Sequence, residues 1–181
     1  LILDDVPSIA VSVEGRYRIA DSAHKTTLYA ASNLMARFTG SSGAIVFSGK
    51  NFTSRRISVI SETGRTVSVN NKHYKGSLQV IRKNSGRLAV VNCLDLEDYV
   101  KGIAVRETSH YWPMEALKAQ AVVFRTFALY RRNESGTRDF DVTADVFSQG
   151  YGGQAAERYR ISDAVDQTRG EALFYDGKIL P

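Results

Sequence analysis

Residues 96–127 read LEDYVKGIAVRETSHYWPMEALKAQAVVFRTF and predict two helices joined by a short polar break. Asp95 is a good N-cap for the first helix, and apolar residues recur at helical spacing from Leu96 onward. Pro113 suits the first position of the second helix, because its missing N–H would have no partner in that turn. The second helix is expected to end near Asn133. Its apolar stripe comprises Met114, Leu117, Ala121, Phe124 and Ala128.

Polar side chains interrupt this apolar pattern. Glu107 lies in the polar break, and Lys118, Gln120 and Arg125 lie within the alanine- and valine-rich second helix. Lys118 and Arg125 are seven residues apart, so they project from roughly the same side of the helix. Polar groups in a core-like pattern need partners, which a cleft around Glu107 would supply. The alternative is structural: Lys118 and Arg125 snorkel from a packed helix and Glu107 caps the next one.

The remaining sequence predicts an α+β protein, with a β-hairpin-rich N-terminal half packed on the two-helix core and a small C-terminal β element. Turn residues separate short alternating or apolar runs. The predicted strands are 44–47, 57–60, 66–69, 78–81, 88–92, 140–142, 171–175 and 178–180, with a short helix over 155–167. We expect a β-rich region over 1–93 and a helical core over 94–181, forming one continuous module.

Composition bounds the class of protein. The 181 residues are 43% hydrophobic, which is enough to bury a core in one or two small domains. No apolar run reaches the ~18–20 residues of a membrane span. The net charge of +5 invites a nucleic-acid-binding interpretation, but the basic residues are spread out and no aromatic-interleaved motif accompanies them. The chain shows no leader and does not begin with Met, so we expect a mature or trimmed product.

Cysteine and histidine usage predicts neither a metal nor another cofactor. Cys93 is the single cysteine and follows an apolar run, so we expect a buried hydrophobic side chain. The three histidines are dispersed without ligand-type spacing.

Several motifs resemble those of the SpoIID/LytB family. They occur in the family's order from about Tyr74 onward, and the EALKAQA block is long enough to be specific. The matching motifs are residues 90–92 (VVN), 96–102 (LEDYVKG), 112–113 (WP), 115–121 (EALKAQA), 125–127 (RTF), 149–153 (QGYGG) and 168–170 (TRG). The resemblance implies peptidoglycan work in the bacterial cell envelope, outside the cytoplasm. One branch of the family acts as a lytic transglycosylase on glycan strands stripped of stem peptides, and the LytB branch is associated with stimulating an amidase.

The resemblance also implies roles for particular residues. Glu107 matches the family's catalytic glutamate. Lys118 and Arg125 match polar positions that line the family's cleft, and Gln149 and Tyr151 lie in a segment expected to contact sugar hydroxyls or N-acetyl groups. These four residues are therefore the predicted substrate-binding residues.

The sequence departs from the family pattern in several places. Gly150 replaces an aliphatic residue, and Phe124 and Phe127 stand where small residues and tyrosine are more usual. Some members bind zinc through one histidine and two cysteines before the glutamine, but residues 140–148 contain neither type, so no metal is expected. A serine- and glycine-rich motif normally follows the last strand, whereas this chain ends at Pro181, so we expect a truncated or shortened member.

The distribution of carboxylates favours a single-glutamate mechanism. A glycoside hydrolase needs two carboxylates at a defined separation. Glu97 is separated from Glu107 by a predicted turn, and Glu115 lies in the first turn of a helix, where a structural role is favoured. To act as an acid near neutral pH, Glu107 should have a pKa raised by burial and opposed by nearby Lys118 or Arg125, and the sequence does not decide which effect is larger. For Tyr111 and Trp112, ordinary core packing is preferred over stacking on a sugar.

The leading hypothesis is a lytic transglycosylase that cleaves peptide-stripped glycan strands to anhydro-ended products, with Glu107 as general acid and base. The alternative is a non-enzymatic envelope module that binds glycan and activates a cell-wall amidase. The expected partners are glycan strands and an amidase. A nucleic-acid-binding domain is the weakest option.

Overall fold

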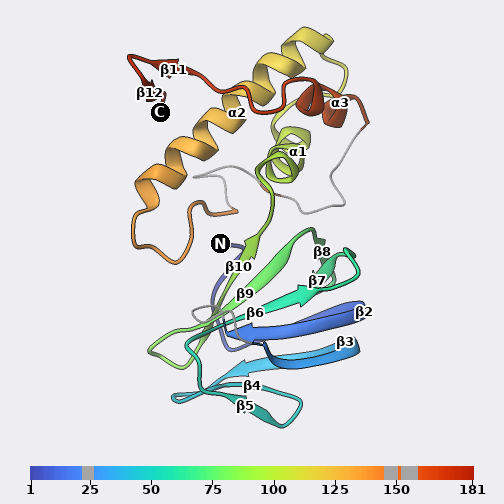
Figure 1. Cartoon of the computed structure of the whole chain (residues 1–181), viewed down its shortest axis with the longest axis vertical. Helices are drawn as coiled ribbons and strands as arrows, with labels where there is room; N and C mark the ends of the chain where they lie inside the picture. Colours follow the sequence, from blue (N-terminus) through green and yellow to red (C-terminus); the bar gives the residue numbers. More distant parts are fainter. Residues whose placement is uncertain (22–26, 145–150, 152–158) are drawn as a thin grey trace. The chain divides into compact units, whose positions relative to one another are not determined.

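The computed structural model describes residues 1–21, 27–144, 151 and 159–181. These residues form two units, Leu1–Leu94 and Asp95–Pro181. The first unit contains a large antiparallel sheet, and the second contains three helices and a short hairpin (Figure 1). The predicted α+β class and the β-rich N-terminal half are confirmed.

Ten strands of the first unit form one sheet (Figure 1). Along its main path the order is β1-β10-β9-β6-β2-β3-β4-β5, and β7 pairs with both β2 and β8. The strands are β1 (Leu3–Val6), β2 (Ser8–Asp21), β3 (Thr27–Gly40), β4 (Ile45–Phe47), β5 (Lys50–Phe52), β6 (Arg56–Ser61), β7 (Val67–Val69), β8 (Lys72–Tyr74), β9 (Ser77–Arg82) and β10 (Leu88–Cys93). Neighbouring strands run antiparallel, which short hairpin connections allow.

The long strand β2 organises this sheet. Its pairing with β3 shifts register between Val13 and Arg16, where Gly15 adopts a φ of 76°. Such a bulge bends the strand and increases its twist. The residues before the bulge pair with β7, and those after it pair with β6. The edge of β2 opposite β3 is therefore shared between two strands.

Aromatic and aliphatic side chains fill the core of the first unit. The rings of Phe38 and Phe47 stack with centroids 4.7 Å apart, and the ring of Phe52 stacks with that of Phe47 at a centroid distance of 6.3 Å. Fully burying one such side chain contributes about 1.5–3 kcal/mol. The completely buried aliphatic residues include Ile9, Ile19, Ile57, Val59, Leu78, Val80, Leu88 and Val90.

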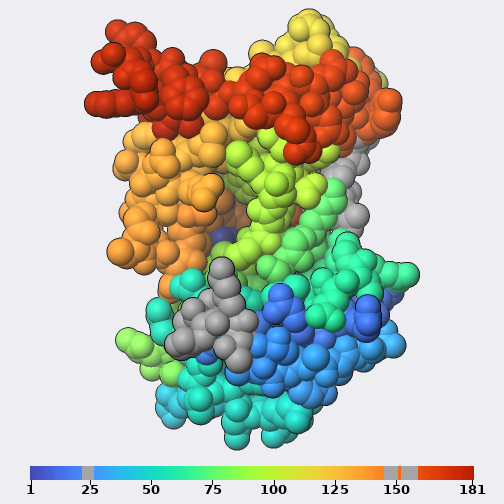
Figure 2. Space-filling view, viewed as in Figure 1, coloured from blue at the N-terminus to red at the C-terminus, as the bar shows by residue number. Residues whose placement is uncertain are grey.

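The second unit is built on helices α1 (Leu96–Glu107), α2 (Met114–Ser135) and α3 (Tyr159–Gln167). All three helices contact one another, and the predicted stripe of α2 is buried at Leu117, Ala121, Phe124 and Ala128. The short strands β11 (Phe174–Tyr175) and β12 (Lys178–Ile179) pair as a hairpin. Figure 2 shows the residues after 159, in red, spread across the surface of α1 and α2.

Some predicted elements differ from the structure. Residues 140–142 form no strand, and the helix predicted over 155–167 is described only from Tyr159 onward. Strands β1, β2, β3, β5 and β8 were not predicted. Within the described parts of the chain, no helix is long and apolar enough to cross a membrane.

Candidate functional site

Helix α1 is fixed at both ends by local hydrogen bonds. At its start the Glu97 amide donates to the Asp95 carboxylate at 2.8 Å, as the predicted N-cap requires. At its end the Thr108 amide and hydroxyl both donate to the Ala104 carbonyl, at 3.0 and 2.6 Å. Glu107 is the last residue of this helix and is exposed. The expectation that Glu107 is buried is therefore wrong, because the helix ends at the surface.

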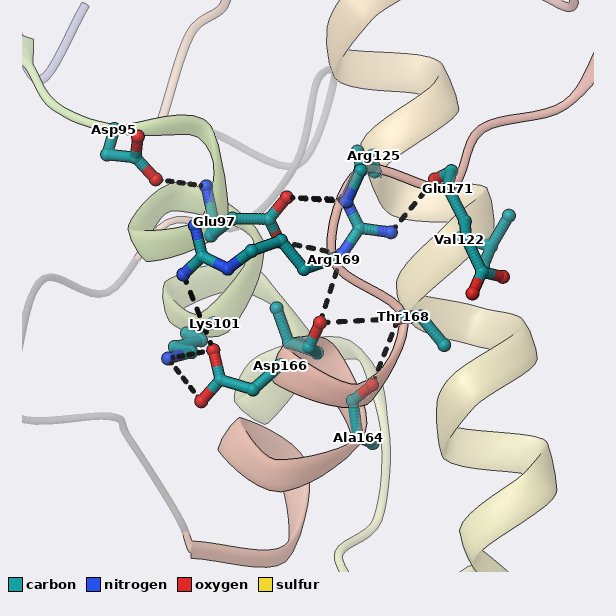
Figure 3. A network of polar contacts seen from close by, with 12 residues as sticks. Asp95, Glu97, Lys101, Val122, Arg125, Ala164, Asp166, Thr168, Arg169 and Glu171 are labelled. Carbon is teal, nitrogen blue, oxygen red and sulfur yellow. Dashed lines mark hydrogen bonds and ion pairs between the residues drawn. The ribbon is translucent and has the colours of Figure 1, made fainter.

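A buried ion pair joins α1 to α2 (Figure 3). Arg125 is 0% exposed and Glu97 is 6% exposed. The guanidinium donates from Nε to Oε1 of Glu97 at 2.9 Å and from Nη2 to Oε2 at 2.6 Å. Paired donors of this geometry make the strongest protein hydrogen bonds. A buried charge is tolerated only with such partners, so the pair fixes the register of the two helices.

The same pair holds the chain that follows α3. Arg125 donates to the carbonyls of Val165 at 3.2 Å and Glu171 at 3.0 Å. The Gly170 amide donates to Oε1 of Glu97 at 3.3 Å. Arg125 was predicted to bind substrate beside Glu107, but the structure places its guanidinium in the interior with internal partners. We therefore assign Arg125 a structural role.

Two of the matching sequence motifs meet around this pair. In the 125–127 motif, the buried Thr126 hydroxyl accepts the Leu173 amide at 3.0 Å. In the 168–170 motif, the buried Thr168 hydroxyl donates to the Ala164 carbonyl at 2.9 Å and so closes the end of α3. Residues far apart in the sequence thus form one polar cluster. Their spacing in the sequence does not reveal which of them pair.

Lys118 remains near the surface of α2. Its ammonium lies 2.8 Å from Oε1 of Glu115, one helical turn earlier, and its side chain is 26% exposed. Lys118 and Arg125 were expected on one flank of α2. In the structure Lys118 makes a surface ion pair, whereas Arg125 is completely buried.

Tyr151 packs against α1. Its ring centroid lies 5.5 Å from that of Tyr99, and its side chain is 8% exposed. Gly102 makes this packing possible, since a Cβ atom there would lie 2.3 Å from the Tyr151 ring. The predicted site residue Gln149 lies outside the described residues.

Burial and a second ion pair shift two pKa values near this packing. Burial raises the pKa of the Tyr99 phenol well above its ordinary value, so the hydroxyl is neutral. Among the described residues this hydroxyl has no hydrogen-bond partner. Between α1 and α3, a hydrogen bond from Lys101 lowers the pKa of Asp166. The two groups lie 2.8 Å apart and tie α1 to α3.

The connection between α1 and α2 carries exposed aromatic rings. Tyr111 is 80% exposed and Trp112 is 42% exposed, so the preference for core packing of these two residues is wrong. The turn beginning at Ser109 directs them outward, since the Trp112 amide donates to the Ser109 carbonyl at 3.0 Å. Within the described residues, no group of three or more His, Cys, Asp or Glu side chains is arranged to hold a metal ion.

Comparisons with known proteins identify the family of the chain. The model of the SpoIID family, described as stage II sporulation protein, matches residues 84–175. An uncharacterized protein of Brachyspira hyodysenteriae is 42% identical over 123 residues, which are 67% of this chain and 33% of that protein. The amidase enhancer of Bacillus subtilis is 37% identical over 81 residues, which are 45% of this chain and 10% of the enhancer. An uncharacterized protein of Chlamydia muridarum is 34% identical over 102 residues, which are 55% of this chain and 35% of that protein.

The chain spans about a third or less of the length of these relatives. The family match begins in the last part of the first unit and includes all three helices. It also includes Glu107, the Glu97–Arg125 pair and the aromatic connection. With about half of its residues matched, the chain belongs to the SpoIID family.

Proposed function

We propose that the helical unit is a lytic transglycosylase that cleaves peptide-stripped glycan strands of peptidoglycan, with Glu107 as its single general acid and base. Membership of the SpoIID family supports a cell-wall-related role. The observation that carries the proposal is the position of Glu107 at the fixed end of α1, directly before a connection with exposed aromatic residues. A site outside the cytoplasm follows from this substrate.

The proposed reaction needs one carboxyl group. The protonated Glu107 donates its proton to the glycosidic oxygen as the bond from that oxygen to the anomeric carbon breaks. The 6-hydroxyl oxygen of the sugar that contains this anomeric carbon then bonds to it. The proton of that hydroxyl passes to the Glu107 carboxylate. Glu107 is thereby returned to its acid form. The product carries an anhydro ring, and no water is consumed.

Two other glutamates of the long helices, Glu97 and Glu115, have structural partners, which favours this scheme over hydrolysis by two carboxylates. Glu97 is buried and accepts hydrogen bonds from Arg125 and Gly170. Glu115 pairs with Lys118 on the surface.

The predicted substrate-binding residues take different parts in the proposal. We propose that Lys118 exchanges its pairing with Glu115 for a lactyl carboxylate of the glycan. The buried Tyr151 packs against α1, and Arg125 holds the helices that carry the site. A sugar contact from Gln149 stays a prediction.

Digestion of peptide-free glycan strands, followed by product mass measurement, tests the proposal. We expect anhydro-ended fragments, lighter by one water than hydrolysis products, and their loss in Glu107→Gln. Glu115→Gln is the matched control and should retain most of the activity. Fragments with ordinary reducing ends, or undiminished cleavage by Glu107→Gln, would refute the role of Glu107.

A second candidate is stimulation of a cell-wall amidase by a glycan-binding, non-enzymatic chain. It is favoured by the similarity to a Bacillus subtilis protein named amidase enhancer. In this case a cell-wall amidase should release more stem peptide when the purified chain is added, and Glu107→Gln should stimulate as well as the parent. No glycan fragments would form without the amidase.

A further inference from the structure

We propose that the α1–α2 connection, residues 108–113, is a carbohydrate-stacking platform on which Tyr111 and Trp112 hold a pyranose ring of the glycan. The inference rests on the proposed function for the identity of the glycan. The connection begins immediately after Glu107, so a sugar held there would lie next to the proposed acid along the chain.

Exposure alone does not identify such a platform, because single exposed apolar residues are common on protein surfaces. What distinguishes Tyr111 and Trp112 is that they are adjacent, large and aromatic, in a connection of only six residues. Their exposed fractions, 80% and 42%, leave ring surface available to a ligand.

The backbone of the connection is held in one conformation. Arg160 of α3 donates from Nη1 to the His110 carbonyl at 3.0 Å and from Nη2 to the Trp112 carbonyl at 3.1 Å. One planar guanidinium therefore fixes the carbonyls on both sides of Tyr111. The Ser109 hydroxyl accepts the Tyr111 amide at 3.4 Å and adds a local constraint. A surface ordered before binding loses less entropy when a ligand binds.

A neighbouring ring also supports Tyr111. The ring centroids of His110 and Tyr111 lie 3.9 Å apart, with 37° between the ring planes. Tyr111 stays 80% exposed in spite of this contact, so its ring has a supported side and a solvent side. Tyrosine and tryptophan supply a large, rigid, amphipathic contact area at low entropic cost.

A pyranose ring fits these features. Its axial C–H groups form an apolar face that an aromatic ring can cover, while its hydroxyls stay in contact with water. An alternating glycan presents such faces repeatedly along the strand. We therefore assign the platform to a sugar of the glycan, and a protein segment as its occupant becomes an outcome of the test.

The chain's single tryptophan makes the platform directly observable, because all of the tryptophan emission comes from Trp112. The experiment titrates the Glu107→Gln chain, which should not cleave its ligand, with peptide-free glycan oligosaccharides. Tryptophan emission and calorimetric heat are measured on the same samples. We expect a saturable change in emission whose midpoint equals the calorimetric Kd.

Four substitutions in the Glu107→Gln chain test the assignment. Tyr111→Ala should weaken oligosaccharide binding by about tenfold, the scale of one aromatic contact. Tyr111→Phe keeps the ring and should bind within about twofold of the parent. Arg160→Ala should weaken binding several-fold while leaving the far-ultraviolet circular dichroism unchanged. Tyr175→Ala is the matched control, since Tyr175 is 76% exposed on β11, and its Kd should equal that of the parent.

The outcomes separate this inference from the proposed reaction. Three results would each overturn the platform: binding heat without a change in Trp112 emission, undiminished binding by Tyr111→Ala, and no oligosaccharide binding at all. The last result would also leave a protein segment as the occupant of this surface. Anhydro products that depend on Glu107, together with unchanged Trp112 emission, would refute the platform and leave the lytic reaction supported. A responding Trp112 in a wild-type chain that yields no fragments would support the platform and refute the lytic reaction.

Discussion

Arg125 and Glu97 are two charged side chains buried in the interior of the helical unit, where an unpaired charge is costly. Both side chains are more than nine-tenths buried, and together they bond to each other and to the backbone of Val165, Gly170 and Glu171. Removing one member leaves the other charge in the interior without its counter-ion, which is far more costly than never having buried the pair. Removing Arg125 would also take a donor from the Val165 and Glu171 carbonyls, and removing Glu97 would take the acceptor of the Gly170 amide.

We therefore expect Arg125→Met and Glu97→Gln each to lower the free energy of unfolding by about 3–5 kcal/mol. Urea denaturation followed by circular dichroism measures this loss. Lys118→Met is the matched control on the same helix, and should cost no more than about 1 kcal/mol because its pair with Glu115 is at the surface. Equal losses for Arg125 and Lys118 would contradict the structural role of Arg125.

At the level of elements, the contact between α1 and Tyr151 depends on the missing side chain of Gly102. Glycine inside a helix costs roughly 1 kcal/mol relative to alanine, so its presence needs a reason. That reason is the Tyr151 ring, which a Cβ atom would approach to 2.3 Å. The packing of the Tyr151 ring against α1 thus compensates for the lower helix propensity of glycine at position 102.

Gly102→Ala should destabilise the chain by about 1–3 kcal/mol, because the ring must move out of its place. In a Tyr151→Ala background the same change should be neutral or stabilising, since only the helix propensity remains. The four unfolding free energies form a double-mutant cycle. A coupling energy near zero would show that the ring does not rest on Gly102.

The ion pair between α1 and α3 gives the stability a pH dependence. The hydrogen bond from Lys101 holds the pKa of folded Asp166 below its ordinary 3.8. A carboxyl group with a lowered folded pKa contributes stability above its unfolded pKa and loses it as the pH falls through the folded value. Asp166→Asn should therefore cost up to about 1 kcal/mol at pH 7, because this pair is partly exposed.

Unfolding of the parent and Asp166→Asn chains at a series of pH values measures the effect. Their difference should shrink only below about pH 4, where the carboxyl group protonates. A difference that is the same at pH 7 and well below pH 3 would show that the pair contributes nothing through charge.

Helices and strands could be predicted where the hydrophobic periodicity of the sequence runs uninterrupted through the whole element. The cap at Asp95, the proline before α2 and the apolar stripe of α2 predicted both long helices, although α2 begins at Met114 and Pro113 is its N-cap instead of its first residue. Strand β2 was missed although Ile9, Val11 and Val13 alternate, because the Gly15 bulge divides its pattern. The Glu97–Arg125 pairing was also missed: a polar residue in an apolar run predicts that a partner exists, but only the packing of helices selects which one.

For the whole molecule, the distribution of charge differs between the two units. Residues 1–94 carry thirteen Lys and Arg against five Asp and Glu, whereas residues 95–181 carry eleven against fourteen. Ion pairs occupy four acids of the first unit, namely Asp4, Asp5, Glu14 and Glu62. The sheet unit is therefore strongly basic, and it would attract the lactyl carboxylates of a peptide-stripped glycan.

Binding of peptide-free glycan by the whole chain should consequently weaken as sodium chloride rises from about 0.05 to about 0.5 M, because salt screens exposed charges. Calorimetry at each concentration measures the change. A neutral oligomer of N-acetylglucosamine is the control, and its affinity should stay nearly constant. The same salt dependence for both ligands would exclude an electrostatic contribution from the glycan carboxylates.

The sequence separation between Arg125 and its carbonyl acceptors also affects when the helical unit can fold during synthesis. Its carbonyl acceptors lie 40 and 46 residues further along the chain, at Val165 and Glu171. While the polypeptide is being made, the Arg125 guanidinium has no complete set of acceptors until Glu171 has emerged. The helical unit should therefore reach its native state late, and a chain stalled before that point should be an easy target for proteases.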